Sequence, residues 1–290
     1  MSGLLFCLAS GAAFGAMAVF GKLAYDEGAT VGTLLAIRFT LAAALFWLGG
    51  AARALRALDR GDIAGALALG ACGYALQAGC YFAALSRIDA SLLSLLLYTF
   101  PAMVAIAAVA LGRERLTGQR ALALVLASGG GALVVAGAGA GALDPLGAAL
   151  GLAAATVYSA YILVSDGISR RVPPLVLAAL VCTGAAVSLC VGSVLLGELR
   201  PGALSAAGWG WIACLAVVST VGAISLFFAG LRRVGPTTAA ILATVEPLVT
   251  VLLAFMIFGE TLGPVQLLGG LLVVCAVIAL NVRRPEPVPA

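Results

Sequence analysis

The sequence predicts an all-α integral membrane protein, with ten transmembrane helices arranged as two inverted five-helix repeats. Three observations lead to this fold. Hydrophobic residues make up 63% of the 290 residues and charged residues only 10%, against about 25% charged in soluble domains. The charges divide the chain into apolar stretches of membrane-spanning length, and a segment of the first half recurs in the second. A soluble protein is therefore excluded, because too little polar surface is present to cover one.

The spans follow from the positions of the charged residues. A helix needs about 20 mostly apolar residues to cross the hydrocarbon core, and the stretches between charges have that length. Prolines such as Pro145 and Pro264 stand just ahead of a span, where the missing N–H costs nothing. The predicted spans are 3–24, 31–50, 63–85, 91–112, 120–138, 146–165, 174–197, 208–230, 237–258 and 264–282.

Basic residues gather on one side of these spans. Lys22, Arg87 and Arg200 fall on the other side, and Arg38 falls inside a span. Cytoplasmic loops carry the excess of Lys and Arg, so both termini are predicted to lie in the cytoplasm and the chain in the plasma membrane. A disordered cytoplasmic tail is expected at 283–290. The arginines of the richer side are Arg53, Arg56, Arg60, Arg113, Arg115, Arg120, Arg170, Arg171, Arg232, Arg233, Arg283 and Arg284.

An internal repeat divides the chain. Residues 81–116 align with 227–262 without a gap, with identical residues at nine of the 36 positions. The matches include the pairs Pro101/Pro247 and Glu114/Glu260, which apolar composition alone does not produce.

This repeat predicts two five-helix units, at 1–143 and 144–282. An odd number of spans inserts the second unit the opposite way up. Inverted repeats are typical of secondary transporters, whose sites lie between the halves near the bilayer midplane. The sequence therefore predicts a transporter that works by alternating access.

Several short motifs resemble one known family. They are Gly21-Lys22, the segment 37–39 (IRF), Tyr98-Thr-Phe-Pro101 followed by Leu111-Gly-Arg-Glu114, and Glu246-Pro247 followed by Phe258-Gly-Glu260. With five-plus-five helices, these motifs are similar to EamA-type members of the drug/metabolite transporter superfamily. The resemblance implies transport of a metabolite. Bacterial relatives of this size include aromatic amino-acid exporters of the YddG type, so it also implies export of amino acids.

Polar and aromatic residues recur at spacings of three and four, which puts them on one face of a helix. The face of span 63–85 carries an amide that is costly against lipid, and it predicts a cavity suited to a small amphipathic zwitterion. Single Ser and Thr residues fit helix packing as well, at about 0.6 kcal/mol each, and that alternative stays open. The candidate substrate-binding residues are Tyr74, Gln77, Tyr81, Ser94, Tyr98, Tyr158, Tyr161, Ser219 and Thr244.

Four further residues are singled out inside spans. A charge at the bilayer centre costs about 2.5–3.5 kcal/mol on insertion scales, so Arg38 and Glu246 are each expected to face the interior beside a partner. Arg38 is interpreted as a structural anchor. Glu246 is either a proton acceptor, since burial disfavours its charged form, or a structural residue that pairs with Arg38 or bonds to a neighbouring helix. Pro101 and Pro247 each remove a backbone bond and are predicted hinges.

Other classes of function have little support. Histidine is absent, and the seven cysteines form no C-x-x-C pair, so no metal, cofactor or enzymatic activity is predicted. A net charge of +4 gives no reason to expect nucleic acid as a partner. The expected partners are a small-molecule substrate and the lipid bilayer, with the chain acting as a monomer. Two alternatives remain: export of another metabolite or drug-like compound, and a non-transporting scaffold or receptor.

Overall fold

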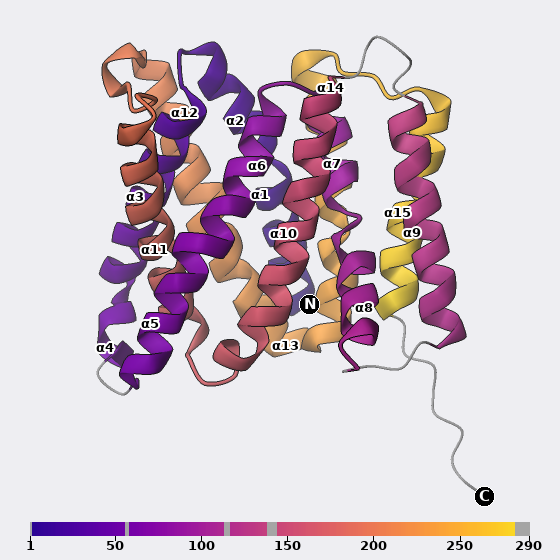
Figure 1. Ribbon diagram of the computed structural model, residues 1–290, viewed down its shortest axis with the longest axis horizontal. Coiled ribbons are helices and arrows are strands. Elements are labelled where there is room, and N and C mark those ends of the chain that lie inside the picture. The colour runs from indigo at the N-terminus through magenta and orange to yellow at the C-terminus, as the bar shows by residue number, and fades with distance from the viewer. Residues whose placement is uncertain (1, 56–57, 113–116, 138–143, 282–290) are drawn as a thin grey trace, which may run out of the picture.

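The protein is a bundle of membrane-spanning helices. The computed structural model describes residues 2–55, 58–112, 117–137 and 144–281, and these contain helices and no strand. Within them, eight helices are long and apolar enough to cross a membrane, and two shorter apolar helices stand beside these. The helices run side by side between two end faces that carry the connections (Figure 1). The all-α membrane fold is thus confirmed. The predicted tail at 283–290 lies outside the described residues.

The first half of the chain forms five spans, of which the first four are interrupted. A π-helical segment, Trp47–Ala51, lies in the second span, and another, Leu69–Tyr74, lies in the third. The α-helices are α1 (Ser2–Gly15), α2 (Met17–Asp26), α3 (Val31–Phe46), α4 (Ala52–Leu55), α5 (Arg60–Ala68), α6 (Ala75–Leu85), α7 (Ala90–Leu97), α8 (Phe100–Ala110) and α9 (Gly118–Ala136).

The second half repeats this pattern of spans. Its third span also contains a π-helical segment, Val217–Gly222, and a short 3₁₀ turn, Pro201–Ala203, precedes that span. The α-helices are α10 (Pro145–Ser169), α11 (Pro174–Leu195), α12 (Ala206–Ala216), α13 (Ala223–Ala243), α14 (Val245–Phe258) and α15 (Pro264–Asn281).

The boundary between the predicted spans 208–230 and 237–258 differs from the prediction. Helix α13 runs from the last part of the first of these spans into the first part of the second. The chain reverses direction within this helix at Gly235, where φ is 79° and ψ is 166°. Only glycine adopts this conformation readily. A single residue therefore makes the turn for which the sequence predicts a short loop.

The two proline-containing spans break at equivalent places. Helix α7 ends at Leu97 and α8 begins at Phe100, just before Pro101. Helix α13 ends at Ala243 and α14 begins at Val245, just before Pro247. A proline cannot donate to the carbonyl four residues earlier, so in each span the backbone is interrupted in the turn that precedes the proline.

Helix packing follows a two-fold pattern. Helix α3 packs against α11, and α9 against α15, so the second spans of the two halves meet and so do the fifth. Helix α1, in the first span of the first half, packs on α13, in the third span of the second half. Conversely, α6, in the third span of the first half, packs on α10, the first span of the second half. The same set of contacts results when the halves are exchanged, as two related five-helix units require.

The tightest crossing joins α11 to the third span. A Cβ atom added at Gly184 would lie 2.1 Å from the carbonyl oxygen of Leu67, and one added at Gly70 would lie 2.0 Å from that of Val181. Both contacts are with backbone, which cannot rotate away. The two helices approach this closely because glycine is present on both sides.

The charges distinguish the two end faces of the bundle. Helix α4, the start of α5, the end of α10 and the kink of α13 lie at the bottom of Figure 1. These segments contain or adjoin Arg53, Arg60, Arg170 and Arg232, respectively. We call this end of the bundle the arginine-rich face and the other the opposite face. The arginines at 56, 113, 115, 283 and 284 lie outside the described residues.

Two single cysteines, each in a variant lacking the seven native ones, should report this orientation. Gly61 and Gly202 are exposed, with no heavy atom within 4 Å of an added Cβ, so cysteine fits at both. A membrane-impermeant maleimide applied to intact cells should label Gly202→Cys and leave Gly61→Cys unlabelled until the membrane is opened. The reverse pattern would contradict the assignment of the arginine-rich face to the cytoplasm.

Candidate functional site

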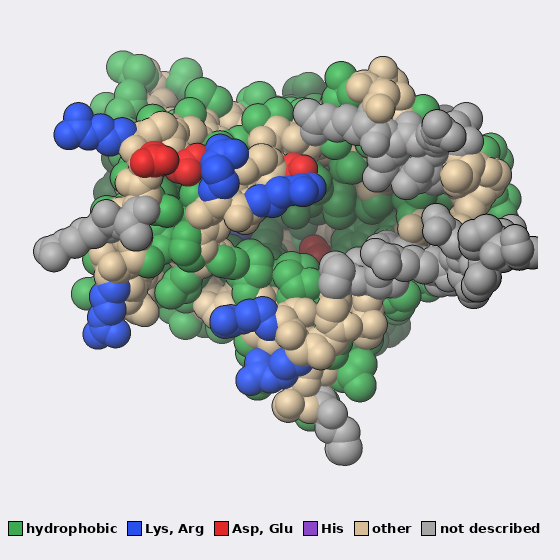
Figure 2. Space-filling view, turned by 90° about the horizontal axis from the view of Figure 1, so that it is seen from below, with side chains coloured by type: hydrophobic (Ala, Val, Ile, Leu, Met, Phe, Trp, Pro, Cys, Tyr) green, Lys and Arg blue, Asp and Glu red, His purple; other side chains and the backbone are tan. Residues whose placement is uncertain are grey.

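A cavity of about 1040 Å³ lies between the two halves. Helices of both halves line it, from α1 at Cys7 to α15 at Val277. Its wall continues to Asp166 and Arg170, at the end of α10 on the arginine-rich face. Figure 2 views that face and shows the hollow, with basic side chains around it. The cavity therefore opens towards the arginine-rich face.

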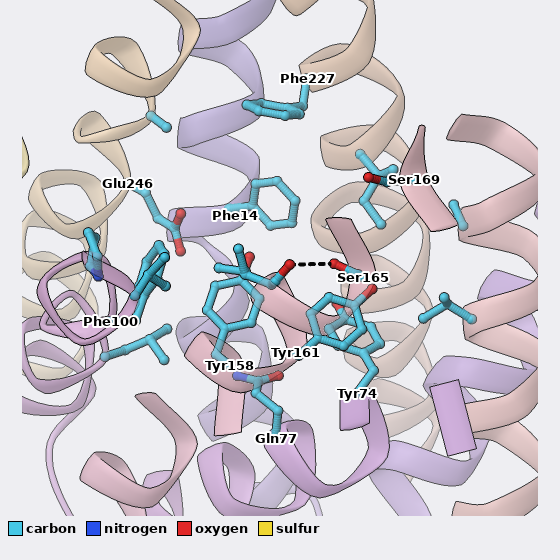
Figure 3. Close-up of a pocket in the computed structure, with 18 of the residues that line it drawn as sticks. Phe14, Tyr74, Gln77, Phe100, Tyr158, Tyr161, Ser165, Ser169, Phe227 and Glu246 are labelled. Atoms are coloured by element: carbon cyan, nitrogen blue, oxygen red, sulfur yellow. Dashed lines mark hydrogen bonds between the residues drawn. The ribbon is translucent and has the colours of Figure 1, made fainter. Parts of the chain in front are cut away.

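Aromatic rings form a continuous row along the cavity wall. Tyr74 contacts Tyr161 at 5.6 Å between ring centroids, and Tyr161 stacks on Tyr158 at 6.1 Å. Phe100 continues the row, 4.7 Å from Tyr158 and 5.9 Å from Tyr98. Figure 3 shows the three rings of Tyr74, Tyr158 and Tyr161 together beside the cavity. Such a wall is suited to an apolar or aromatic part of a ligand.

Glu246 stands at one end of this row. Its Oε2 atom lies 3.0 Å from the hydroxyl oxygen of Tyr98, and that hydroxyl lies 2.7 Å from the carbonyl oxygen of Ala243. The Ala243 carbonyl lacks its usual helical donor, because residue 247 is a proline. The break ahead of Pro247 thus supplies the acceptor that holds Tyr98 beside the carboxyl group.

Arg38 lies near the other end of the row. Its neighbour Phe39 contacts Tyr74, with 5.3 Å between ring centroids. The Arg38 side chain lines the cavity and is only 2% exposed. No ion pair joins it to Glu246 in the described part of the chain. The fixed Arg38–Glu246 pair that the sequence leaves open is therefore not formed here.

Near the opposite face a buried carboxylate joins three helices, an arrangement that we call the Glu260 closure. Glu260 follows α14 and accepts hydrogen bonds from Lys22 Nζ at 2.6 Å and from the Ser91 amide at 2.9 Å. The Ser91 hydroxyl and the Ala90 amide also donate to it. One side chain thereby joins α2, the start of α7 and the end of α14. Its repeat mate Glu114 lies outside the described residues.

The closure by Glu260 should depend on pH. Burial raises the pKa of Glu260, but hydrogen bonds from Lys22, Ser91 and Ala90 outweigh burial and place the pKa below its ordinary value. The stabilisation is therefore present above the ordinary carboxyl pKa and is lost as pH falls through the lowered one. Glu260→Gln should lower the free energy of unfolding at neutral pH by about 1–3 kcal/mol, and Tm should fall with it. In acid the difference in Tm between the variant and the wild type should vanish.

Asp89→Asn is the control for Glu260→Gln. Asp89 also faces Lys22, at 3.6 Å, but its side chain is 63% exposed, and exposed pairs contribute about 0–1 kcal/mol. Melting curves across a pH series compare the two variants. Equal losses in both, or a Glu260→Gln effect that persists at low pH, would contradict the role given to Glu260.

Most of the candidate residues predicted from sequence meet at the cavity. The structure brings eight of them to its wall, and their roles in substrate binding stay predictions. One of the two predicted hinges, Pro101, also lies there. The eight are Arg38, Tyr74, Gln77, Tyr81, Tyr98, Tyr158, Tyr161 and Glu246.

Three predicted cavity residues lie away from this wall. Ser94, Ser219 and Thr244 are buried but do not line the cavity, and Thr244 donates its hydroxyl to the carbonyl of Ile241. Pro247 likewise packs inside the bundle. For the two serines and the threonine the helix-packing alternative describes what the structure has, and the hinge role of Pro247 stays a prediction.

Other wall residues were not singled out from the sequence. Phe14, Phe100 and Phe227 line the cavity, and Asp166 lies at its mouth. A lone phenylalanine in an apolar span carries no signal, since lipid-facing and cavity-facing positions look alike. Phe100 is the exception, because it is the repeat mate of Glu246 at the same offset of 146.

Comparison with known proteins places the chain among transporters. It is 27% identical over 277 residues to "Uncharacterized transporter YcbK" of Bacillus subtilis, covering 92% of this chain and 89% of that one. A 70-residue stretch is 40% identical to an uncharacterized transporter of Archaeoglobus fulgidus, covering 24% and 26% of the two chains. A protein of known crystal structure shares the fold, with a TM-score of 0.67, 21% identity and 96% of each chain covered.

A family model matches the chain twice. The description of that model is "EamA-like transporter family", and the matches span residues 1–136 and 145–282. Together they cover nearly the whole sequence, including every helix that lines the cavity. The chain belongs to the EamA-like transporter family, within the drug/metabolite transporter superfamily.

Proposed function

We propose that this transporter moves small amphipathic metabolites, above all amino acids including aromatic ones, out of the cell by alternating access. The observation that carries the proposal is the cavity between the halves, whose wall reaches the arginine-rich face, while the Glu260 closure joins helices at the opposite face. A carrier exposes its site to one side at a time, and two related halves can exchange conformations to expose it to the other. The whole cavity belongs to one chain, so a monomer suffices.

The charges on the two faces support the proposed direction of transport. The open side is the arginine-rich face, which the positive-inside rule assigns to the cytoplasm. In this conformation the cavity receives substrate from the cell interior. Opening of the Glu260 closure would then release substrate outside, with the arginine-rich face closed in turn.

Proton exchange at Glu246 would drive the cycle. The Tyr98 hydroxyl has one proton and two oxygen neighbours, the Ala243 carbonyl at 2.7 Å and Glu246 Oε2 at 3.0 Å. The Glu246 carboxyl group thus receives only a share of this one hydrogen and forms no ion pair with a described cation, and a carboxyl group in a bundle interior without a cation is favoured in its neutral form. This arrangement favours a protonated Glu246 in the empty cavity.

A single carboxyl group then couples two fluxes. Glu246 can hold either a proton or the ammonium group of a substrate, and binding one excludes the other. Substrate loading on the cytoplasmic side would release the proton there, and protonation from outside would release the substrate. The inward proton gradient thereby supports export.

Reconstituted protein provides the test of function. Proteoliposomes loaded with unlabelled phenylalanine should take up labelled phenylalanine in counterflow, and the flux should saturate. Saturable counterflow of a different metabolite alone would favour the alternative substrate classes. Absence of flux for all compounds offered would favour a scaffold or receptor.

Gln77→Ala should lower transport several-fold and leave Tm close to wild type. Gln77 lines the cavity and is 8% exposed, and its amide donates to and accepts from no described residue, so no internal bond is lost. Leu76→Ala, a truncation at the neighbouring position with 56% of the side chain exposed, is the control. Initial counterflow rates compare the two. Wild-type flux in Gln77→Ala would exclude this helix face from the substrate path.

A further inference from the structure

We propose that Arg38 binds the carboxylate of the transported molecule and selects for acids over their uncharged analogues. The inference rests on the proposed transport function and deepens it, since it assigns the substrate's anionic group to one residue. The guanidinium of Arg38 is buried in the wall of the cavity, and no residue that the structure describes accepts a hydrogen bond from its two Nη groups.

Neighbouring residues fix the orientation of Arg38. Its guanidinium carbon lies 4.9 Å from the centre of the Phe39 ring and 5.2 Å from that of Phe82. Its Nε atom donates to the hydroxyl of Thr220 at 3.0 Å. Thr220 in turn donates to the carbonyl of Leu215, so its lone pairs are free for Nε. Two rings and one hydroxyl hold the group on three sides.

The two Nη groups form the remaining edge of the Arg38 guanidinium. Within the described chain, no residue accepts a hydrogen bond from either Nη atom of Arg38. Among those same residues, the one fully buried side-chain oxygen or nitrogen without a partner is Ser219 Oγ. The Nη atoms of Arg38 therefore keep some accessible surface, and this surface faces the cavity that the residue lines.

The charge of Arg38 is also uncompensated. The described charged residues of the cavity wall are Arg38, Asp166, Arg170 and Glu246. Asp166 and Arg170 pair with each other at the mouth, with 3.0 Å between Nη2 and Oδ2. Glu246 is held by Tyr98 and forms no ion pair with Arg38. A buried cation without an anion is costly, and a substrate anion would remove that cost.

The free edge matches a carboxylate. Two parallel N–H groups of a guanidinium bind the two oxygens of a carboxylate side by side. A phosphate would bring a second negative charge, and the described wall offers no second unpaired cation to receive it. The row of aromatic rings runs from Phe39, beside Arg38, to Tyr98, beside Glu246. An acid with an apolar or aromatic body would therefore find a partner for its carboxylate at Arg38 and for its body along the row of rings.

Matched ligands test the inference on the purified full-length protein. Phenylalanine and phenylalaninamide share the ring and the amine, and 3-phenylpropanoate keeps only the ring and the carboxylate. Apparent Kd values come from the dependence of Tm on ligand concentration. In the wild type, phenylalanine should bind about 10- to 100-fold more tightly than its amide, the range expected for hydrogen bonds to a charged group. The propanoate should bind too.

Variants of Arg38 identify the residue responsible. In Arg38→Gln the ratio of the Kd for phenylalaninamide to the Kd for phenylalanine should fall to about one. Arg38→Lys keeps the charge but loses the two parallel N–H groups, so it should give an intermediate ratio. Arg60→Gln removes an exposed arginine outside the cavity and should keep the wild-type ratio. If Arg38→Gln does not fold, the wild-type comparison and Arg38→Lys carry the test.

The outcomes separate this inference from the proposed function. If the wild type binds acid and amide equally, or if Arg38→Gln keeps the preference for the acid, the assignment to Arg38 is wrong. Saturable counterflow of phenylalanine would in that case leave the transport function standing. If neither binding nor flux occurs with any of these ligands, the amino-acid transport function fails and this inference fails with it.

Discussion

Glu246→Gln should abolish accumulation driven by a pH gradient and retain counterflow exchange, although substrate should bind more weakly because the carboxylate that receives its ammonium group is lost. Glutamine keeps the size of the side chain, and its amide can donate to the Tyr98 hydroxyl, which lies 3.0 Å from Oε2 in the wild type. The fold and the cavity are thus preserved, but the residue no longer binds and releases a proton. Exchange of substrate for substrate requires no proton, whereas net export coupled to protons does.

The measurement uses proteoliposomes with and without a pH difference. With one-for-one exchange, a difference of one pH unit supports up to about a tenfold substrate gradient. The wild type should approach this gradient and Glu246→Gln should reach none. Asp26→Asn, which neutralises an exposed acid outside the cavity, should behave as wild type. A Glu246→Gln variant that still accumulates substrate would make Glu246 a structural residue.

Gly184→Ala should be among the most destabilising single-methyl changes in the protein. Its Cβ would lie 2.1 Å from the carbonyl oxygen of Leu67, so α11 and the third span must separate. Overpacking of this kind costs about 1–3 kcal/mol, and more where the neighbour cannot move. Val181 and Cys182, one turn before Gly184, line the cavity, so transport should fall together with Tm.

Gly192→Ala, on the same helix, is the matched control. No heavy atom lies within 4 Å of a Cβ built there, and alanine is favoured over glycine in a helix by about 1 kcal/mol. Tm should therefore stay constant or rise in Gly192→Ala and fall in Gly184→Ala. If both variants melt alike, the close crossing of α11 and the third span is not what holds these helices together.

The composition of the sequence determines much of the fold. Charges are rare enough that their positions mark the ends of the spans, and Pro145, Pro174 and Pro264 each begin a helix. Pro101 and Pro247 occupy equivalent positions in the two repeats, and this predicts an interrupted helix at the same place in the fourth span of each half. The structure puts each break ahead of the proline, because the interrupted hydrogen bond belongs to the preceding turn.

The arrangement of the site was less accessible from sequence. Periodicity shows that Tyr74 and Gln77 share a helix face, but not which helix that face meets. Arg38 and Glu246 were expected to need partners, and a mutual ion pair was one solution. In the structure Arg38 instead donates to Thr220, and Glu246 accepts from Tyr98. These hydrogen bonds join different spans, so no local sequence pattern predicts them.

The serines and threonines illustrate the same limit. Ser94 and Ser219 are spaced as cavity residues would be, yet both are buried in helix contacts. A hydroxyl is small enough to be accommodated between helices or to face water, so its position in the sequence does not distinguish the two. The π-helical segment at Val217–Gly222 has wider turns than an α-helix, so the spacing of three and four does not predict the face on which Ser219 lies.

Proton release on substrate binding tests the central claim most directly. Phenylalanine is added to purified wild-type protein in weakly buffered detergent solution near neutral pH, and the pH change is recorded against the amount bound. If the carboxyl group of Glu246 holds a proton in the empty cavity and gives it up to an ammonium group, the wild type should release about one proton for each molecule bound, and Glu246→Gln should release none. Binding by the wild type without proton release would contradict the exchange at Glu246 on which the account depends.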